Sequence, residues 1–372
     1  MNGKYHAPWR LVAISAPAQV GNALGLFDHA GLLCSEPPQN EASREGGPGD
    51  VISIQRKPDS MEPLEIEYRK RACDEEGYWL DVEPFSDLAD SINDEPSHDL
   101  ARLLIEKTLK AISAAMESEI NSNGMYVTVT KYTPNGKVGL GLGGSASSAS
   151  IVMALDYMFR EPLLSLEEQD GILRRLSLMG DAEEVVSGHK FYDNVAPLAI
   201  PGGLIHIDDP DPENPKVTAL PWPKDLWMTT ITPEFALKTR QMREALNDKQ
   251  VPWKQAEIAS QYRAEVMRGL YTDDAARVIR YSGDSIVEGF RWPHIKASDA
   301  LLKHIEQKRA ADALYAIGIS GSGPTVYVLS TSKREADQIG HELHEIWKHQ
   351  GIMSWWFVHE HNKAGARVIE VS

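Results

Sequence analysis

A cluster of glycines followed directly by small residues is the feature that most constrains this chain. The cluster lies between a strand-like stretch at 125–132 and a helical stretch at 145–159. Its glycines are Gly139, Gly141, Gly143 and Gly144. Glycine lets the backbone approach a ligand closely, and the start of a helix offers free N–H groups and a positive dipole end. The segment therefore predicts an anion site, most often one for phosphate, with a plain Gly/Ser turn as the alternative.

Two common phosphate loops fit the cluster poorly. The Walker A loop requires Gly-Lys-Ser/Thr after its glycines, and no lysine follows here. The dinucleotide fingerprint matches the spacing of Gly139, Gly141 and Gly144, but the acid expected about 20 residues later has its nearest candidate at Asp156, inside the helical stretch. A dinucleotide-binding oxidoreductase therefore stays an alternative that rests on glycine spacing alone.

Three segments, in order along the chain, resemble the motifs of one kinase superfamily. Residues 141–146 (Gly-Leu-Gly-Gly-Ser-Ala) are similar to the ATP loop of the GHMP kinases, named for galactokinase, homoserine kinase, mevalonate kinase and phosphomevalonate kinase. Residues 16–22 resemble the Ala-Pro-Ala-x-x-x-Asn opening of homoserine kinases, and residues 318–325 resemble the third, glycine-rich motif of the superfamily. Further segments similar to homoserine kinases lie at 187–197, 233–243, 284–291 and 364–368. By resemblance, the chain is identified as a member of the homoserine kinase family.

The resemblance implies an α+β fold with two domains. Residues 1–210 would form an N-terminal ATP-binding domain like ribosomal protein S5, and residues 211–372 a C-terminal ferredoxin-like α+β sandwich. The length of 372 residues is large for one core, and the Pro- and Asp-rich break at 208–215 is the predicted boundary. Strands are expected at 11–15, 51–55, 125–132, 227–232, 325–330, 355–358 and 367–371, and helices at 99–119, 145–159, 297–309 and 334–349.

ATP and Mg²⁺ are the cofactors that the resemblance implies. Ser145 and Glu183 would be the magnesium ligands, and hydroxyl and carboxylate oxygens suit that ion. Glu183 is expected just beyond the core of a helix running toward Asp181, where a solvated acid is the alternative. The ungapped register from Asn194 favours Glu183 over Glu184. The residues expected to contact ATP are Lys137, Val138, Gly139, Leu140, Gly141, Leu142, Gly143, Gly144, Ser145, Ala146, Ser147, Thr239, Gly321, Ser322 and Gly323.

Asn194 stands where several members of the superfamily carry a catalytic aspartate and where homoserine kinases carry asparagine. An amide is no strong base, so it would orient the substrate hydroxyl by hydrogen bonds. The dissociative character of phosphoryl transfer makes a base less necessary. Asp193 would either contact the substrate or cap a helix that begins at Val195. The catalytic residues that the resemblance implies are Asn194, Glu183, Arg243 and Ser145.

The implied substrate, L-homoserine, carries a carboxylate and an ammonium group. A guanidinium fork binds both oxygens of a carboxylate, and Arg243 and Arg291 match the two family arginines in that role. Isolated arginines in so acidic a chain are more often surface ion pairs, so this role rests on the resemblance. The substrate-binding residues that it implies are Asn22, Asp28, Asp193, Asn194, Arg243 and Arg291.

Phe191 is the clearest departure from the family pattern. Homoserine kinases usually carry histidine at this position, two residues before the Asp-Asn pair, and a phenyl ring cannot replace its hydrogen bond. If Phe191 has merely drifted from the pattern, Phe191→His should improve homoserine kcat/KM or leave it unchanged. Otherwise the acceptor is a different alcohol. A non-catalytic sensor on the same fold is a further alternative, against which the retained Ser145, Glu183 and Asn194 argue.

Composition narrows the class of protein further. Apolar residues make up 42% and charged residues 25%, as in ordinary globular proteins, and the net charge of −16 argues against nucleic-acid or anionic-membrane partners. Cys34 and Cys73 cannot form a disulfide framework and fit a cytoplasmic location. The short apolar run at 11–14 is interpreted as a first strand, not a signal peptide. A homodimer is expected from the resemblance alone.

Overall fold

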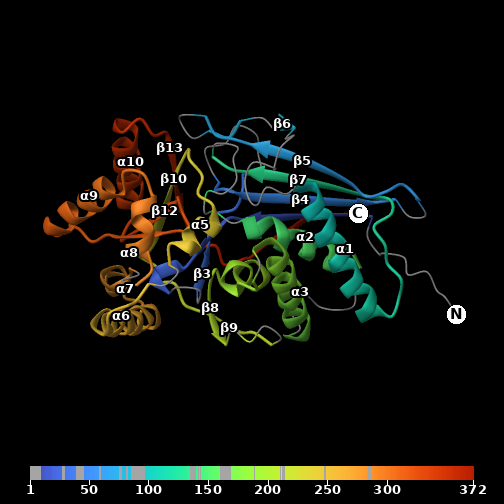
Figure 1. Cartoon of the computed structure of the whole chain (residues 1–372), viewed down its shortest axis with the longest axis horizontal. Coiled ribbons are helices and arrows are strands. Elements are labelled where there is room, and N and C mark those ends of the chain that lie inside the picture. The colour runs from blue at the N-terminus through green and yellow to red at the C-terminus, as the bar shows by residue number, and fades with distance from the viewer. Residues whose placement is uncertain are drawn as a thin grey trace.

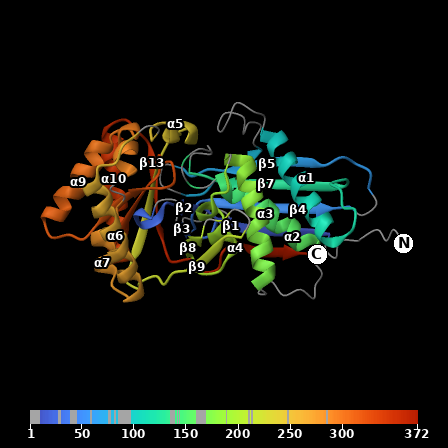
Figure 2. The same cartoon turned by 60° about the horizontal axis from the view of Figure 1, so that its bottom comes forward.

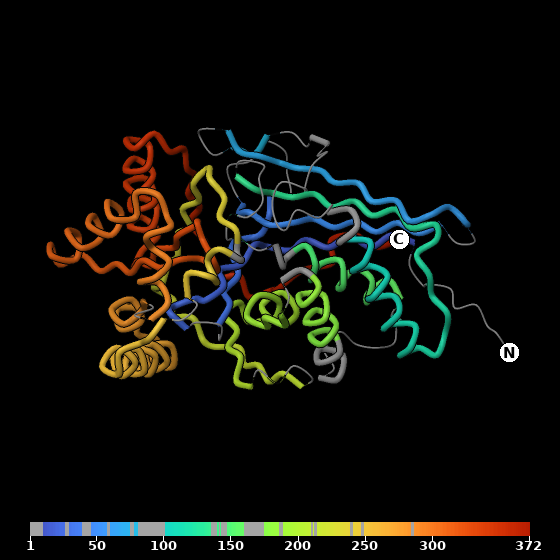
Figure 3. Tube along the Cα trace, viewed as in Figure 1, coloured from blue at the N-terminus to red at the C-terminus, as the bar shows by residue number. Residues whose placement is uncertain are grey.

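The computed structural model describes residues 10–26, 30–38, 46–57, 60–74, 78–80, 83–84, 97–134, 140, 142, 144–159, 169–187, 189–209, 211, 214–246, 249–283 and 286–372. The molecule is elongated, with two lobes (Figure 3). Most of the N-terminal part of the chain forms the right-hand lobe of Figure 1, and the segments from β10 to β13, drawn from yellow to red, form the left-hand lobe.

A six-stranded sheet forms the frame of the right-hand lobe. Its order is β14–β1–β4–β7–β5–β6, and every neighbouring pair is antiparallel except β5 with β7. The C-terminal strand returns to lie beside the first one, where Val371 pairs with Val12 (Figure 2). The bounds are β1 (Leu11–Pro17), β4 (Gly49–Arg56), β5 (Glu65–Arg71), β6 (Glu83–Pro84), β7 (Met125–Tyr132) and β14 (Arg367–Val371).

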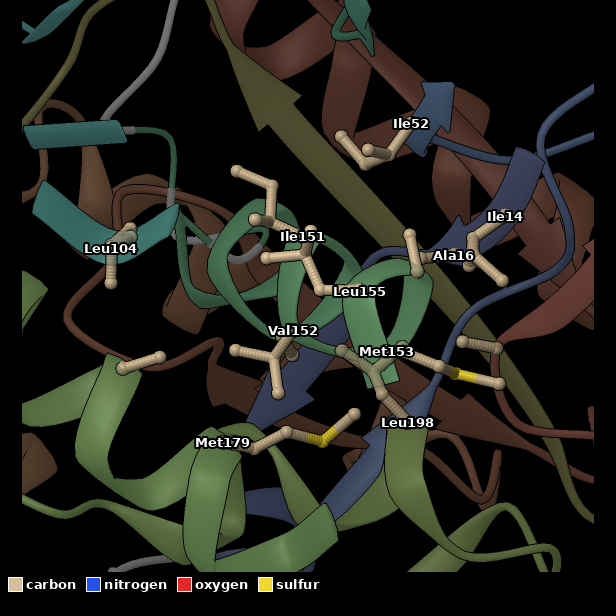
Figure 4. Packing of buried hydrophobic residues seen from close by; sticks show 14 of the residues in the cluster. Ile14, Ala16, Ile52, Leu104, Ile151, Val152, Met153, Leu155, Met179 and Leu198 are labelled. Carbon is tan, nitrogen blue, oxygen red and sulfur yellow. The ribbon is translucent and has the colours of Figure 1, made fainter. Parts of the chain in front are cut away.

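Three helices lie on one side of this sheet: α1 (Ser97–Met116) and α2 (Gly144–Phe159) contact its strands, and α3 (Gln169–Ser187) packs against both of these helices (Figure 1). The middle helix, α2, is buried along nearly all of its described length because it packs on β1 and β4 and also between α1 and α3. Its Ile151 and Leu155 point toward the sheet, while Met179 approaches it from α3 (Figure 4). Glu183 lies within α3, which continues to Ser187, so the expectation that it falls just beyond the core of this helix is wrong.

A small four-stranded sheet with the order β2–β3–β8–β9 lies between the two lobes. It packs against a short 3-10 turn, η2, and the helix that follows it, α4. The bounds are β2 (Gln19–Gly21), η1 (Ala23–Gly25), β3 (Ala30–Leu33), η2 (Tyr192–Asn194), α4 (Ala196–Ala199), β8 (Leu204–Asp209) and β9 (Lys216–Ala219).

The left-hand lobe is built on an antiparallel sheet with the order β11–β12–β10–β13. Helices separate β10 from the β11–β12 pair and α10 separates that pair from β13, which is the ferredoxin-like arrangement expected for this part of the chain. The bounds are β10 (Trp227–Pro233), α5 (Thr239–Glu244), α6 (Trp253–Tyr271), α7 (Ala275–Tyr281), α8 (Glu288–Arg291), η3 (Trp292–His294), α9 (Ser298–Ala310), β11 (Ala316–Ile319), β12 (Val326–Ser330), α10 (Lys333–His349) and β13 (Ser354–His359).

The sequence explains why α10 forms and packs where it does. The Ser332 hydroxyl accepts a hydrogen bond from the backbone N–H of Glu335 and so caps the helix. Ile339, Leu343 and Trp347 recur at helical spacing and are fully buried. This apolar stripe holds α10 on β10, β12 and β13.

Strand pairing crosses the predicted domain boundary. β9 and β14 both follow residue 210, yet β9 pairs with β8 and β14 pairs with β1. The Pro- and Asp-rich segment at 208–215 therefore connects two neighbouring strands, and the limits 1–210 and 211–372 remain a prediction. Within the described residues, no helix is both long enough and apolar enough to span a membrane.

Candidate active site

Three segments that are far apart in the sequence meet where the two lobes join. The backbone N–H of Gly321 donates to the carbonyl of Gly21 at 3.0 Å, and the side-chain amide of Asn22 donates to the carbonyl of Gly321 at 3.2 Å. A Cβ on Gly21 would lie only 2.8 Å from Oδ1 of Asn194. The N-terminal motif, the η2 turn and the third motif are thus in contact.

Glycines make this close approach possible. A side chain at Gly31 would place its Cβ 2.0 Å from the carbonyl oxygen of Asp193, which no native contact allows. Asp193 is 2% exposed, so the turn is pressed against β2 and β3. The N-cap of α4 is Val195, whose side chain makes no capping hydrogen bond. Asp193 therefore does not occupy the capping position, and substrate contact remains the other interpretation.

Glu183 lies next to Asn194. Nδ2 of Asn194 donates to Oε1 of Glu183 at 3.3 Å. Glu183 is 0% exposed, whereas Glu184, the neighbouring acid on α3, is exposed. Because a buried carboxylate is costly unless it is paired or binds a cation, the solvated-acid alternative for Glu183 is wrong.

Glu183 offers a buried carboxylate oxygen, a donor type that suits magnesium. Magnesium is usually held by one or two carboxylates together with substrate phosphates and water. Ser145 belongs to the first turn of α2, and its side chain lies outside the part of the chain that the structure describes.

The segment before α2 is tied to the third motif. The carbonyl of Leu140 accepts hydrogen bonds from the N–H and the hydroxyl of Thr325, at 3.1 and 2.5 Å. Leu140 and Leu142 are buried, and Gly144 opens α2. The expected ATP contacts that fall outside the described residues are Lys137, Val138, Gly139, Gly141 and Gly143.

A buried network lies under the start of α2, and sequence reasoning missed it. The Ser147 hydroxyl accepts from Nζ of Lys131 at 2.5 Å and donates to Oδ2 of Asp50 at 2.7 Å. Lys131 and Asp50 are paired residues on β7 and β4, with Nζ and Oδ1 3.6 Å apart. Both are at most 8% exposed. The Ser147 hydroxyl therefore anchors the helix to the sheet.

Both predicted arginines reach this region, from different helices. Arg291 of α8 is 6% exposed, and its Nη1 donates to the carbonyl of Gly321 at 2.8 Å, the same atom that Asn22 contacts. The surface-ion-pair alternative is therefore wrong for Arg291. Arg243 of α5 is half-buried, and its Cζ lies 4.5 Å from the centre of the Phe191 ring.

The remaining predicted residues are placed only in part. Ser322 and Gly323 belong to the turn between β11 and β12, where the N–H of Gly323 donates to the carbonyl of Ser320 at 2.8 Å. Thr239 is the first residue of α5 and Ala146 lies in α2, but their side chains are not described. Asp28 lies outside the described residues.

One family model matches the C-terminal part of the chain. The model describes the C-terminal region of GHMP kinases and matches residues 273–349. This range runs from the residues just before α7 through α10 and includes Arg291 and the third motif.

Relatives and solved structures extend the similarity beyond that range. The chain is 30% identical over 261 residues to a homoserine kinase from Methanococcus maripaludis, which covers 69% of this chain and 79% of the relative. It is similar in fold to the crystal structure of homoserine kinase from Cytophaga hutchinsonii, with a TM-score of 0.72, 24% identity and coverage of 99% and 100% of the two chains. Mevalonate diphosphate decarboxylase from Enterococcus faecalis, described as binding ATP, matches with a TM-score of 0.56 at 14% identity over 97% of this chain and 99% of its own. These neighbours confirm the α+β GHMP-kinase fold.

Proposed function

This chain belongs to the homoserine kinase family of the GHMP superfamily, and from that premise we propose that it transfers the γ-phosphoryl group of ATP to the side-chain hydroxyl of L-homoserine. The product is O-phospho-L-homoserine, an intermediate in threonine synthesis. The contact between Glu183 and Asn194, made beside Asn22, Arg291 and Gly321, is the observation that supports this proposal most. It joins a candidate metal ligand to a candidate hydroxyl-orienting group.

The phosphates of ATP would bind at the glycine cluster and the start of α2. GHMP kinases use ATP, and the expected loop residues stay proposals. The helix dipole and the free amides of the first turn favour an anion there. The network of Lys131, Ser147 and Asp50 fixes that turn on the sheet, which would help to keep its amides oriented toward a phosphate.

Glu183 and the Ser145 hydroxyl would hold Mg²⁺. A bound magnesium ion would neutralise charge on the phosphate oxygens. Because Asn194 donates to Glu183, the amide nitrogen helps to fix the carboxylate in place. The fold thus holds this ligand ready before nucleotide arrives.

Asn194 would orient the acceptor hydroxyl without removing its proton as a strong base. A carboxylate only accepts hydrogen bonds, so the side chain must turn its nitrogen toward Glu183 and its Oδ1 toward Gly21. Oδ1 can then accept the hydrogen bond of a substrate hydroxyl. Phosphoryl transfer through a loose transition state asks chiefly for such positioning.

The amino-acid end of the substrate would bind on the opposite side of Asn194. We assign its carboxylate to Arg243 and Arg291, and its ammonium group to Asn22, Asp28 and Asp193. A homodimer acting in the cytoplasm on small molecules, without nucleic acid or membrane, completes the proposal. Cys34 and Cys73, both free and buried, are consistent with a reducing compartment.

A coupled assay of ADP release tests the function. The protein with ATP and Mg²⁺ is offered L-homoserine, L-threonine, L-serine, mevalonate and sugars in parallel. We expect ADP release with L-homoserine well above the level without acceptor. Release only with another alcohol would show that Phe191 belongs to a pocket for a different acceptor, and release with none would reject the kinase proposal.

A further inference from the structure

We propose that Phe191 is a positioning residue, which holds the guanidinium of Arg243 in the orientation that binds the substrate carboxylate. This inference rests on the proposed function, in which Arg243 binds that group. Phe191 comes from the segment between α3 and η2, whereas Arg243 comes from α5 in the other lobe. The contact therefore joins the substrate-binding arginine to the turn that carries Asn194.

The geometry is that of a cation–π contact. Cζ of Arg243 lies 4.5 Å from the centroid of the Phe191 ring, and both side chains are half-buried. A cation above an aromatic face within about 6 Å is attracted by the ring quadrupole, more strongly where water is partly excluded. The half-buried setting thus favours a fixed guanidinium.

An aromatic partner leaves the hydrogen-bonding capacity of the arginine intact. A ring face contacts the planar guanidinium without accepting its five N–H groups. An aspartate or glutamate in the same place would occupy the fork and compete with the substrate carboxylate. Phe191 can therefore orient Arg243 while both oxygens of the substrate remain free to bind it.

Phe191 is itself held by its neighbours. The ring of His189 meets it edge-on, with centroids 5.8 Å apart and planes at 81°, and Nζ of Lys190 pairs with Asp181 of α3 at 2.8 Å. The carbonyl of Phe191 accepts the N–H of Asn194 at 3.1 Å. The ring and the catalytic amide are thus placed by one short segment.

The contact changes what the family pattern predicts for this position. If Phe191 had merely drifted from histidine, Phe191→His should improve homoserine kcat/KM or leave it unchanged. Since the phenyl face supports Arg243, we now expect Phe191→His to lower it.

The experiment compares KM for homoserine and for ATP in four variants. Phe191→Leu should raise KM for homoserine by about 3- to 30-fold, with KM for ATP unchanged. Phe191→Tyr keeps the ring face and should stay close to wild type. Trp227→Leu is the matched control. It removes a ring whose centroid lies 6.0 Å from Nζ of Lys333, in a contact outside the site, and it should change neither KM. Equal losses in the Leu and Tyr variants, or a gain in Phe191→His, would overturn the proposal.

A double-mutant cycle tests whether Phe191 acts through Arg243. In the Arg243→Ala background, Phe191→Leu should cause no further loss of homoserine kcat/KM, whereas a full further loss would contradict the proposal. If wild type shows no homoserine-dependent turnover, the proposed function fails by itself. In that case the Tm values of the same four proteins test the contact between Phe191 and Arg243. Tm shifts of the two single variants that add up in the double variant would reject the contact, and a smaller combined shift would support it.

Discussion

Nδ2 of Asn194 donates a hydrogen bond to Oε1 of Glu183 across 3.3 Å, and this contact joins the η2 turn to α3 inside the protein. Glu183 is 0% exposed and Asn194 is partly exposed. The carboxylate of Glu183 therefore lies deeper than the amide of Asn194, which is the group that solvent can reach. This arrangement suits the proposed roles, in which Glu183 binds the metal ion and Asn194 contacts the substrate.

The first prediction separates Glu183 from its neighbour. Glu183→Gln keeps the size of the side chain and an oxygen for Asn194 but removes the negative charge that would hold magnesium. Turnover should collapse while the unfolding temperature stays near that of wild type. Glu184→Gln, on the exposed side of α3, is the matched control and should be nearly silent in an ADP-release assay. If the two variants exchanged behaviours, the metal ligand would be Glu184.

The two arginines should differ in their effect on ATP. Truncating one partner of a buried charge pair costs about 2–5 kcal/mol, so Arg243→Ala should lower homoserine kcat/KM by roughly 30-fold to several-thousand-fold. The KM of Arg243→Ala for ATP should stay unchanged. Arg291→Ala should raise both KM values, because Arg291 also supports the carbonyl of Gly321 in the third motif. Steady-state kinetics with each substrate varied would measure this, and an unchanged KM for ATP in Arg291→Ala would contradict it.

Lys131 should matter for stability as well as for nucleotide affinity. Lys131→Met leaves Asp50 buried without its cation, and breaking a buried pair in this way costs about 3–5 kcal/mol. Denaturant unfolding measures the loss, and KM for ATP should rise because Ser147 loses its donor. Lys57→Met is the control: its pair with Glu62 is 76% and 65% exposed and should be worth less than about 1 kcal/mol. Equal effects of both variants would mean that the buried network does not support α2.

Stability should fall in mild acid because of His359. Burial lowers the pKa of His359 from 6.5 to about 3. Its Nδ1 accepts the N–H of Ser35 at 3.0 Å, so the proton is on Nε2, which faces the Thr230 hydroxyl at 2.7 Å. A depressed folded pKa means that its stabilisation is present above pH 6.5 and declines as the pH falls toward 3.

The size of this decline can be checked by a matched variant. Between pH 7.5 and pH 5 the loss from His359 alone is about 2 kcal/mol. His359→Gln should be less stable than wild type at pH 7.5, and the difference should shrink at pH 5, as measured by denaturant unfolding. The contribution of carboxylates that titrate in both proteins cancels in this difference. If the unfolding free energies of wild type and variant fell in parallel with pH, the role of His359 would be refuted.

Local patterns predicted the elements that have strong periodicity. The strand at 125–132 and the last strand at 367–371 match β7 and β14, and the helix at 334–349 matches α10 within one residue. The first has alternation and the helix has helical spacing, whereas the last strand overlaps the segment at 364–368 that resembles the family. The short, buried strands β2, β3 and β11 lack such a pattern, because every residue in them is buried.

Motifs in the sequence predicted which segments come together, whereas the contacts that depend on the fold alone were missed. Asn22, Asn194 and Arg291 lie close together around Gly21 and Gly321, and their roles stay predictions. By contrast, Lys131 and Asp50 become partners only because β4 and β7 lie side by side. The cation–π contact of Arg243 with Phe191 likewise depends on how two distant segments approach, and no spacing within either segment encodes it.

Identification of the phosphorylated product tests the central claim most directly. Wild-type protein is incubated with ATP, Mg²⁺ and L-homoserine, and the mixture is followed by ³¹P NMR beside the Glu183→Gln variant. We predict a phosphomonoester signal, coupled to the side-chain methylene protons of homoserine, that grows in step with ADP and is lost in the variant. ADP accompanied only by inorganic phosphate, or an ester formed on another alcohol but never on homoserine, would contradict the account.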